Sequence, residues 1–474
     1  MNNALDKLDE EIAEGAHSPV SGVGSAIIAG EGVAGEGVAG EGIAVAARRR
    51  VLQELPAYLL VQIAWFTAFG MQMVLFPYLL KNVLEVSGTL LGVAQMALAA
   101  PSVVFILLGG VMAERADGRT LLIVFNLVAA LPAAALAFAI DAGQLEYWMM
   151  LTYALALGTI GAFMMPARDA ILNEIVARRR EKGSVITLQQ GVAFATLAQF
   201  AAQIVGLGIG GEASNMRNWP MFQGMSEDTP GEYVWPLLAI QAAIVACGAL
   251  AAFFLDRGQM IQTGRSGIGA VFGDIADGMK CVRRDPVLVS MVISMFGVGV
   301  FVIGGFLVIL PIINADVYGY NSGGLRNIFV TFWAGAFCSS VALSRFRKLN
   351  RPGRLLLAAQ FIGSAGILIL VNGAPYWAFL SLVFIWGLAA GISIMMSRGI
   401  VQAAAPPQLL ARVLSIYQLG FMAGAPIGAA LMGVVADQAG PRLVILVPSI
   451  GMLIMIACMA FFTPIWKMRP VAGV

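Results

Sequence analysis

Charged side chains that could act together occur in two short stretches of this sequence. One runs from Gly109 to Arg119 and the other from Pro166 to Val176. Each stretch combines carboxylates with guanidinium groups, which can form ion pairs. A partly buried network of ion pairs can shift the equilibrium between two conformations of a protein. Contact with lipid head groups is the alternative explanation. With a matching arginine in the second half of the chain, the predicted gating residues are Gly110, Glu114, Arg115, Arg119, Arg168, Asp169, Glu174 and Arg398.

A second group of candidates consists of polar side chains within apolar segments. Gln189, Thr196, Gln199 and Gln203 fall within roughly 80° of one another on a helix. Amides facing lipid would leave hydrogen-bonding groups unsatisfied, so this stripe should face an internal cavity. The alternative is that glutamines join neighbouring helices. With similar faces elsewhere, the predicted substrate-binding residues are Gln62, Trp65, Gln72, Gln189, Thr196, Gln199, Gln203, Trp386, Ser393 and Gln418.

Membrane-spanning helices must position these side chains, because the chain is too apolar for a soluble domain of its length. Hydrophobic residues make up 59% of the 474 residues and charged residues 12%. A helix needs roughly 20 apolar residues to cross the hydrocarbon core. The predicted spans are Leu55–Leu80, Leu90–Ala113, Leu121–Ile140, Tyr147–Pro166, Val185–Gly210, Val234–Leu255, Val287–Ile313, Ile328–Leu343, Leu355–Val371, Tyr376–Met396, Val413–Ala436 and Leu443–Phe462.

The distribution of Lys and Arg predicts the orientation of these spans. With Arg48 to Arg50 in the cytoplasm, the basic residues near span ends are cytoplasmic except Lys81, Arg217, Arg326 and Arg442. Positive charge near span ends sets orientation. We therefore expect a multi-pass protein of the cell (inner) membrane with both termini in the cytoplasm. The net charge of +2 is then a topology signal, and we expect no nucleic-acid binding.

The segments outside the spans predict the domain organisation. Residues 30–42 repeat Gly-Glu-Gly-Val-Ala, which is typical of a disordered segment. An apolar stripe from Ile268 to Val282 predicts an amphipathic helix on the membrane surface or against the bundle. The predicted domains are a disordered cytoplasmic tail (1–54), an N-terminal six-helix bundle (55–255), a cytoplasmic linker with the amphipathic helix (256–286), a C-terminal six-helix bundle (287–465) and a cytoplasmic tail (466–474).

Missing residue types narrow the chemistry of the spans. The single histidine, His17, lies in the tail, and no Asp, Glu, Lys or His occupies the middle of a predicted span. Because deep carboxylates normally mark ion pathways, coupling must use acids near span ends or a titratable group on the substrate. Candidates are Glu85, Glu114, Asp169 and Asp316. A buried substrate charge would lack a counter-ion, which favours a neutral, zwitterionic or amphipathic substrate.

Catalytic and metal chemistry are not expected. The four cysteines are scattered without metal-type spacing, and no nucleophile, base and orienting group come together. The glycines of residues 258–264 lack the lysine of a phosphate loop. We expect no enzyme activity, no cofactor and no metal. The expected partners are a small amphiphilic substrate, membrane lipids and, for a coupled process, protons, and a monomer is the expected state.

The two halves of the chain resemble one another, and one loop resembles a known family. Gly161 and Arg168 match Gly391 and Arg398, and repeated halves of this kind build transporters that rock around a central site. The sequence GGVMAERADGR, which begins at Gly109, resembles the signature loop of the major facilitator superfamily. In that loop a glycine is followed by an acid and basic residues that form a cytoplasmic charge latch.

A second loop is similar to one subgroup of this family. The sequence PARDAILNEIV between Pro166 and Val176 resembles the subgroup of enterobactin-type siderophore exporters and lysophospholipid transporters. The resemblance covers roughly residues 55–465 and implies an all-α membrane fold with twelve helices in two pseudo-repeats and alternating access. We expect proton-linked export of a siderophore, drug or other amphiphile. Lysophospholipid transport or flipping, and a non-transporting assembly or scaffold role, are the alternatives.

Overall fold

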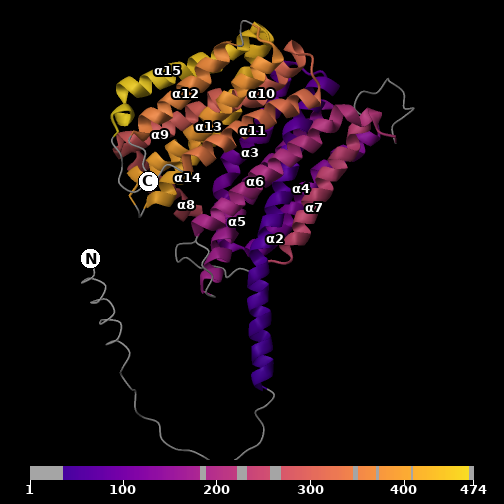
Figure 1. The fold of residues 1–474 in the computed structure, drawn as a ribbon, viewed down its shortest axis with the longest axis vertical. Coiled ribbons are helices and arrows are strands. Elements are labelled where there is room, and N and C mark those ends of the chain that lie inside the picture. Colours follow the sequence, from indigo (N-terminus) through magenta and orange to yellow (C-terminus); the bar gives the residue numbers. More distant parts are fainter. Residues whose placement is uncertain are drawn as a thin grey trace, which may run out of the picture. The chain divides into compact units, whose positions relative to one another are not determined.

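Helices form the whole regular structure of the described chain (Figure 1). The computed structural model describes residues 36–181, 188–220, 232–256, 268–344, 351–369, 373–406 and 409–468. Ten described helices are long and apolar enough to cross a membrane, which confirms the predicted all-α integral membrane fold. The helix predicted as the ninth span, Pro352–Leu368, is shorter than these ten, and the count of twelve spans stays a prediction. The chain divides into residues 1–49 and 50–474, and the spans lie in the second unit.

The first half forms helices where the apolar pattern predicts them. Ser87 and Asp117 begin the second and third of these helices, because their side chains accept hydrogen bonds from the backbone N–H groups of Leu90 and Thr120. The helices are α2 (Glu36–Tyr78), continued by a π-helical end (Leu79–Val83), α3 (Gly88–Arg115), α4 (Gly118–Asp141), α5 (Tyr147–Glu181), α6 (Leu188–Gly211) and α7 (Trp235–Ala252).

The second half also follows the predicted order. Its first span combines four consecutive helical pieces, and the Asp285 side chain caps its beginning. The pieces are α9 (Pro286–Gly297), η5 (Val298–Ile303), α10 (Gly304–Ile312) and η6 (Ile313–Val317). The remaining helices are α11 (Ser322–Ser344), α12 (Pro352–Leu368), α13 (Tyr376–Ala404), α14 (Leu410–Ala439) and α15 (Leu446–Phe462).

Two helices extend beyond their predicted limits. α2 begins at Glu36, within the segment predicted as a disordered tail (1–54), and the Ala, Glu and Arg residues of 36–54 favour helix. The predictions for residues 1–35, including His17, lie outside the described residues. α5 continues past Pro166, because membrane helices tolerate proline when neighbouring groups satisfy the freed backbone. Arg168 therefore lies within a helix.

The linker contains α8 (Ile268–Arg284), a helix at the position of the predicted amphipathic stripe, and the cytoplasmic location of the linker stays a prediction. The helix α8 contacts the second half of the chain: a Cβ atom at Gly278 would lie 2.8 Å from the side chain of Ile416 in α14. Arg412 of α14 also pairs with Asp277 of α8 at 3.4 Å. The helix was predicted to lie either on the membrane surface or against the bundle, and these contacts show that α8 packs against the bundle.

The helix ends define two faces of the bundle. The linker face carries α8, the end of α3 and the beginning of α14, whereas the opposite face carries the beginning of α3 and the end of α14. The two halves meet where α3 contacts α14 and where α6 contacts α11 (Figure 1). α3 and α11 are each the second predicted span of their half, and α6 and α14 are each the fifth. The two contacts are therefore equivalent by the internal repeat.

Glycines permit close approach between helices within each half. A Cβ atom at Gly206 in α6 would lie 2.0 Å from the carbonyl oxygen of Thr67 in α2. At Gly428 in α14 it would lie 2.0 Å from the carbonyl oxygen of Val300 in η5. Small residues at helix interfaces allow backbones to approach in membranes. In both halves, the first and fifth spans therefore pack backbone against backbone.

Candidate functional site

Asp437 joins the two halves at the opposite face. Its carboxylate oxygens accept hydrogen bonds from the backbone N–H groups of Gly88 and Thr89, each at 2.7 Å. These groups begin α3, where a helix has free donors and a partial positive charge. Gly92 and Gly433 lie at the same contact, where a Cβ atom on either would meet the partner helix. A carboxylate of the second half thus caps a helix of the first.

Two ion pairs and a serine close the same face. Lys81 Nζ lies 3.0 Å from Asp316 Oδ2, and Arg326 Nη1 lies 2.7 Å from Glu212 Oε1. Ser322 Oγ donates to the last carbonyl of α6 at 2.9 Å. Each contact joins a residue of the first half to one of the second, so the opposite face is closed by polar contacts between halves.

The linker face carries opposite charges that do not form an ion pair. Asp169 on α5 and Arg398 on α13 are both exposed. Asp169 is attracted by its neighbour Arg168 and, more weakly, by Arg398 across the boundary between the halves. The charged atoms of Asp169 and Arg398 are nevertheless more than 4.0 Å apart. Two of the predicted gating residues, one from each half, therefore lie within electrostatic range of each other without forming an ion pair, and gating by this pair stays a prediction.

Arg168 lies inside the first half. Only 5% of its surface is exposed. The guanidinium carbon lies 4.6 Å from the centroid of the Phe66 ring in α2, which is a cation–π contact. The predicted gating role of Arg168 stays a prediction, and its burial distinguishes it from its exposed neighbour Asp169.

A buried ion pair at the linker face was not predicted. Glu54 of α2 is fully buried, and its Oε2 atom lies 3.4 Å from Arg178 Nε in α5. Arg178 also pairs at 3.5 Å with Glu174, a predicted gating residue. Asp256 lies close enough to Glu54 for the two carboxyl groups to interact electrostatically. Neither these acids nor any other group of His, Cys, Asp and Glu in the described ranges could hold a metal ion. The available signal was Glu54 itself, the last acid before the first span.

Arg178→Gln should destabilise the protein by about 3 kcal/mol, because removing one partner of a buried ion pair leaves the other charge uncompensated. Glu54→Gln should cost less, since the remaining Arg178 side chain is 24% exposed and keeps Glu174. Thermal unfolding of the purified protein in nonionic detergent measures both effects. Lys280→Gln, at an exposed position of α8, serves as the control. Equal melting temperatures for Arg178→Gln and this control would contradict the prediction.

The remaining predicted gating residues lie at the end of α3 and the beginning of α4. The guanidinium carbon of Arg119 lies 5.8 Å from the centroid of the Phe253 ring. Gly110, Glu114 and Arg115 belong to α3, but they are outside the residues whose side chains the structure describes. Gating by these residues stays a prediction.

The predicted polar stripe on α6 divides between two environments. Gln203 is buried, and its amide nitrogen lies 3.2 Å from the Met73 sulfur in α2. Thr196 is exposed and Gln199 is half-buried, whereas the side chain of Gln189 is outside the described set. Gln203 therefore fits the alternative prediction, in which glutamines join neighbouring helices.

The other predicted cavity residues also occupy mixed environments. Gln62 and Gln72 of α2 and Ser393 of α13 are buried, Trp65 is half-buried and Gln418 is exposed. The Oε1 atom of Gln62 has no hydrogen-bond partner. A common cavity formed by these residues stays a prediction.

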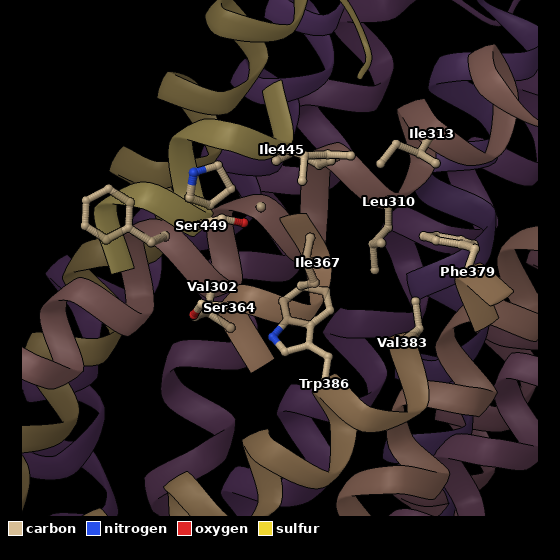
Figure 2. Close-up of a pocket in the computed structure, with 14 residues that line it drawn as sticks. Val302, Leu310, Ile313, Ser364, Ile367, Phe379, Val383, Trp386, Ile445 and Ser449 are labelled. Carbon is tan, nitrogen blue, oxygen red and sulfur yellow. The ribbon is translucent and has the colours of Figure 1, made fainter. Parts of the chain in front are cut away.

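Trp386 lines a small, partly open apolar pocket in the second half. Figure 2 shows its indole ring beside Ser364 and Ile367, with Ser449 further along the wall. The same indole packs against Phe306 at a centroid distance of 5.9 Å. Apart from this indole nitrogen and the two serine hydroxyls, the lining side chains are apolar. The lining of this pocket is therefore suited to contact with an apolar group.

The fold and the closed face define the class of this protein. Two bundles of apolar helices are joined by a linker helix and contact each other through equivalent pairs of helices, as in a polytopic membrane transporter with repeated halves. The model of the Major Facilitator Superfamily matches residues 58–419 and 354–472. The chain belongs to the Major Facilitator Superfamily.

Solved transporters share the fold at low sequence identity. The nucleoside transporter NupG has a TM-score of 0.66 at 14% identity, over 87% of this chain and 99% of that one. A second similar structure is a bacterial homolog of the human lysosomal transporter Spinster in its inward-facing and occupied conformation. It has a TM-score of 0.64 at 13% identity, over 85% of this chain and 94% of that one. A variant of the E. coli fucose:proton symporter FucP has a TM-score of 0.56 at 16% identity, over 85% of this chain and 97% of that one. No curated protein matches the chain.

Proposed function

We propose that this chain is a secondary active transporter that works by alternating access. The asymmetry between the two faces carries the proposal. Asp437 and two ion pairs join the halves at the opposite face, whereas Asp169 and Arg398 attract each other without pairing at the linker face. Halves joined at one face and able to close at the other have the arrangement needed for rocking around a central site.

In this proposal the linker face is the cytoplasmic face. α8 ends in Arg283 and Arg284, and Arg178 lies near the end of α5. Positive residues near span ends favour the cytoplasmic side. Both termini then lie in the cytoplasm of a cell with this protein in its inner membrane, and the structure corresponds to an inward-facing state.

The proposed activity is proton-linked export of a siderophore, drug or other amphiphilic small molecule. The pocket around Trp386 supports an amphiphilic substrate, because its lining is mostly apolar. The same pocket favours lysophospholipid transport as the second candidate, since an acyl chain suits an apolar lining.

Transport by the reconstituted protein tests this function. Proteoliposomes with an imposed pH gradient would receive a fluorescent lysophospholipid, an enterobactin-like siderophore or a cationic dye. Gradient-dependent movement of one compound would support coupled transport and identify its substrate class. Movement of the lysophospholipid without a gradient would support flipping. If folded protein moves none of them, the proposed activity is contradicted and a scaffold role is favoured.

Arg398→Asp should slow transport about fivefold, because two carboxylates would then oppose each other when the linker face closes. An exposed ion pair contributes up to about 1 kcal/mol, and repulsion between like charges has a similar size. The double variant Asp169→Arg, Arg398→Asp restores opposite charges and should recover most of the rate. Initial uptake rates in the proteoliposomes measure both effects. A double variant slower than Arg398→Asp alone would argue against pairing.

A further inference from the structure

Arg168 occupies an interior position of α5. Met164, Ile171 and Ile175 lie at helical spacing from it, and all three are buried. Together with Tyr58 of α2 they belong to one apolar cluster of the first half. The helical period would place an apolar residue at the position of Arg168, yet a guanidinium group stands there with only 5% of the residue exposed.

The guanidinium group of Arg168 has unused hydrogen-bonding capacity. Its Nε and Nη1 atoms are buried and have no hydrogen-bond partner. Among the acidic residues whose side chains the structure describes, none forms an ion pair with it within 4.0 Å, and the attraction of Asp169 acts from a greater distance. Arginine stays protonated in proteins, and an unpaired charge within a membrane protein is strongly unfavourable unless a partner reaches it. The geometry therefore points to an anion as the missing partner.

Two side chains of α2 define the surroundings of this group. The Phe66 ring covers the guanidinium at 4.6 Å, and because a guanidinium donates from its edge, the ring leaves the N–H donors available. Gln62 lies one helical turn before Phe66, is 3% exposed and has an unpartnered Oε1 atom. The amide of Gln62 also carries two N–H donors. An acceptor with several oxygen atoms matches this set.

We propose that Arg168 and Gln62 bind the anionic head group, a carboxylate or a phosphate, of an amphiphilic substrate. The inference rests on the proposed transport function and names the charge of its substrate. Asp169, the next residue, is exposed and attracts both Arg168 and Arg398, but it leaves the buried Nε and Nη1 donors of Arg168 without a hydrogen-bond partner. A substrate charge thus has a fixed counter-ion in the first half, contrary to the expectation from the predicted spans.

Ligands that share one tail and differ in head group test the inference without requiring transport. Thermal unfolding of the full chain in nonionic detergent would be followed with lauroyl lysophosphatidic acid, dodecanoate, lauroyl lysophosphatidylcholine and monolaurin. Inorganic phosphate, which has no tail, separates binding of a free anion from binding of an amphiphile. We expect one of the two anionic amphiphiles to bind about tenfold more tightly than monolaurin, because hydrogen bonds to charged groups typically contribute this much.

Variants at the site separate binding from a structural role. Arg168→Met should abolish the preference for the anionic head group and keep or raise the melting temperature of the ligand-free protein, because it removes an unpaired buried charge. Arg168→Lys should keep part of the preference. Arg442→Met, at an exposed position of the opposite face, removes a positive charge elsewhere and should change neither property.

Three results would overturn the inference. They are equal affinity of the unmodified protein for charged and neutral amphiphiles, an unchanged preference in Arg168→Met, and binding of inorganic phosphate as tight as that of the amphiphiles. A lower melting temperature of ligand-free Arg168→Met without any head-group preference in the parent would assign Arg168 to structure alone. Transport without head-group preference contradicts only this inference, whereas head-group preference without transport contradicts only the proposed function.

Discussion

Asp437→Ala should shift the protein towards a state that is open at the opposite face. The substitution removes two charge-assisted hydrogen bonds of 2.7 Å to the beginning of α3. Such bonds contribute more than neutral ones, but the partial exposure of Asp437 reduces the gain. We expect a loss of about 1–2 kcal/mol, which corresponds to a change of about five- to thirtyfold in the ratio of the two states.

Electron–electron distance measurements between spin labels would detect this shift. Labels at Asp141, where α4 ends, and Leu443, after α14, report the opening of the opposite face. The native cysteines Cys247, Cys281, Cys338 and Cys458 would first be replaced.

The neighbouring position provides the control for Asp437→Ala. Gln438→Ala changes an exposed residue of the same turn and should leave the distance distribution unchanged. Asp437→Asn keeps one acceptor oxygen and should give an intermediate shift. A distribution for Asp437→Ala identical to that of the parent protein would show that the remaining contacts, Lys81 with Asp316 and Arg326 with Glu212, keep this face closed by themselves.

Gly206→Ala should destabilise the first half, although alanine favours helix more than glycine. The added Cβ atom would lie 2.0 Å from the carbonyl oxygen of Thr67 and 3.0 Å from the Cα atom of Gly70. Backbone atoms cannot move aside as a flexible side chain can, so α2 and α6 must separate. Overpacking typically costs about 1–3 kcal/mol, whereas the gain in helix propensity is at most about 1 kcal/mol.

Gly208→Ala is the matched control, because it makes the same change in the same helix where no atom lies within 4 Å of the added Cβ. It should leave the melting temperature unchanged or raise it slightly. Thermal unfolding in detergent compares the two variants, and we expect Gly206→Ala to melt several degrees lower. If both variants melt at the same temperature, the close approach of α2 and α6 does not contribute to stability.

Much of the fold could be predicted because hydrophobic length is a local property. The apolar stretches beginning near Leu55 and Tyr147 gave helices at the expected places, and the stripe from Ile268 gave α8. The limits of the elements were harder to predict. Proline at position 166 suggests a helix end, but α5 continues to Glu181. Membrane helices tolerate proline because neighbouring groups can satisfy the backbone carbonyl whose hydrogen bond the proline removes.

The candidate site could be predicted only in part. The sequence pattern singled out Asp169 and Arg398, which lie within electrostatic range of each other in the structure, and their role in gating stays a prediction. The sequence pattern did not indicate that Asp437 joins the two halves. The partners of Asp437 are backbone N–H groups of α3, and backbone groups have no signature in the sequence. Trp386 lines an apolar pocket within the second half, and the amphiphilic cavity that it was predicted to share with Gln62 and Gln203 stays a prediction.

The amino-acid sequence was enough to predict a helical membrane protein with repeated halves, since apolar length and charge distribution act on each segment separately. It could not show that Arg168 is buried with two donors lacking a hydrogen-bond partner, that Glu54 pairs with Arg178, or that polar contacts close the opposite face. These properties depend on the rotation of each helix and on its neighbours, and both arise from packing between segments far apart in the chain.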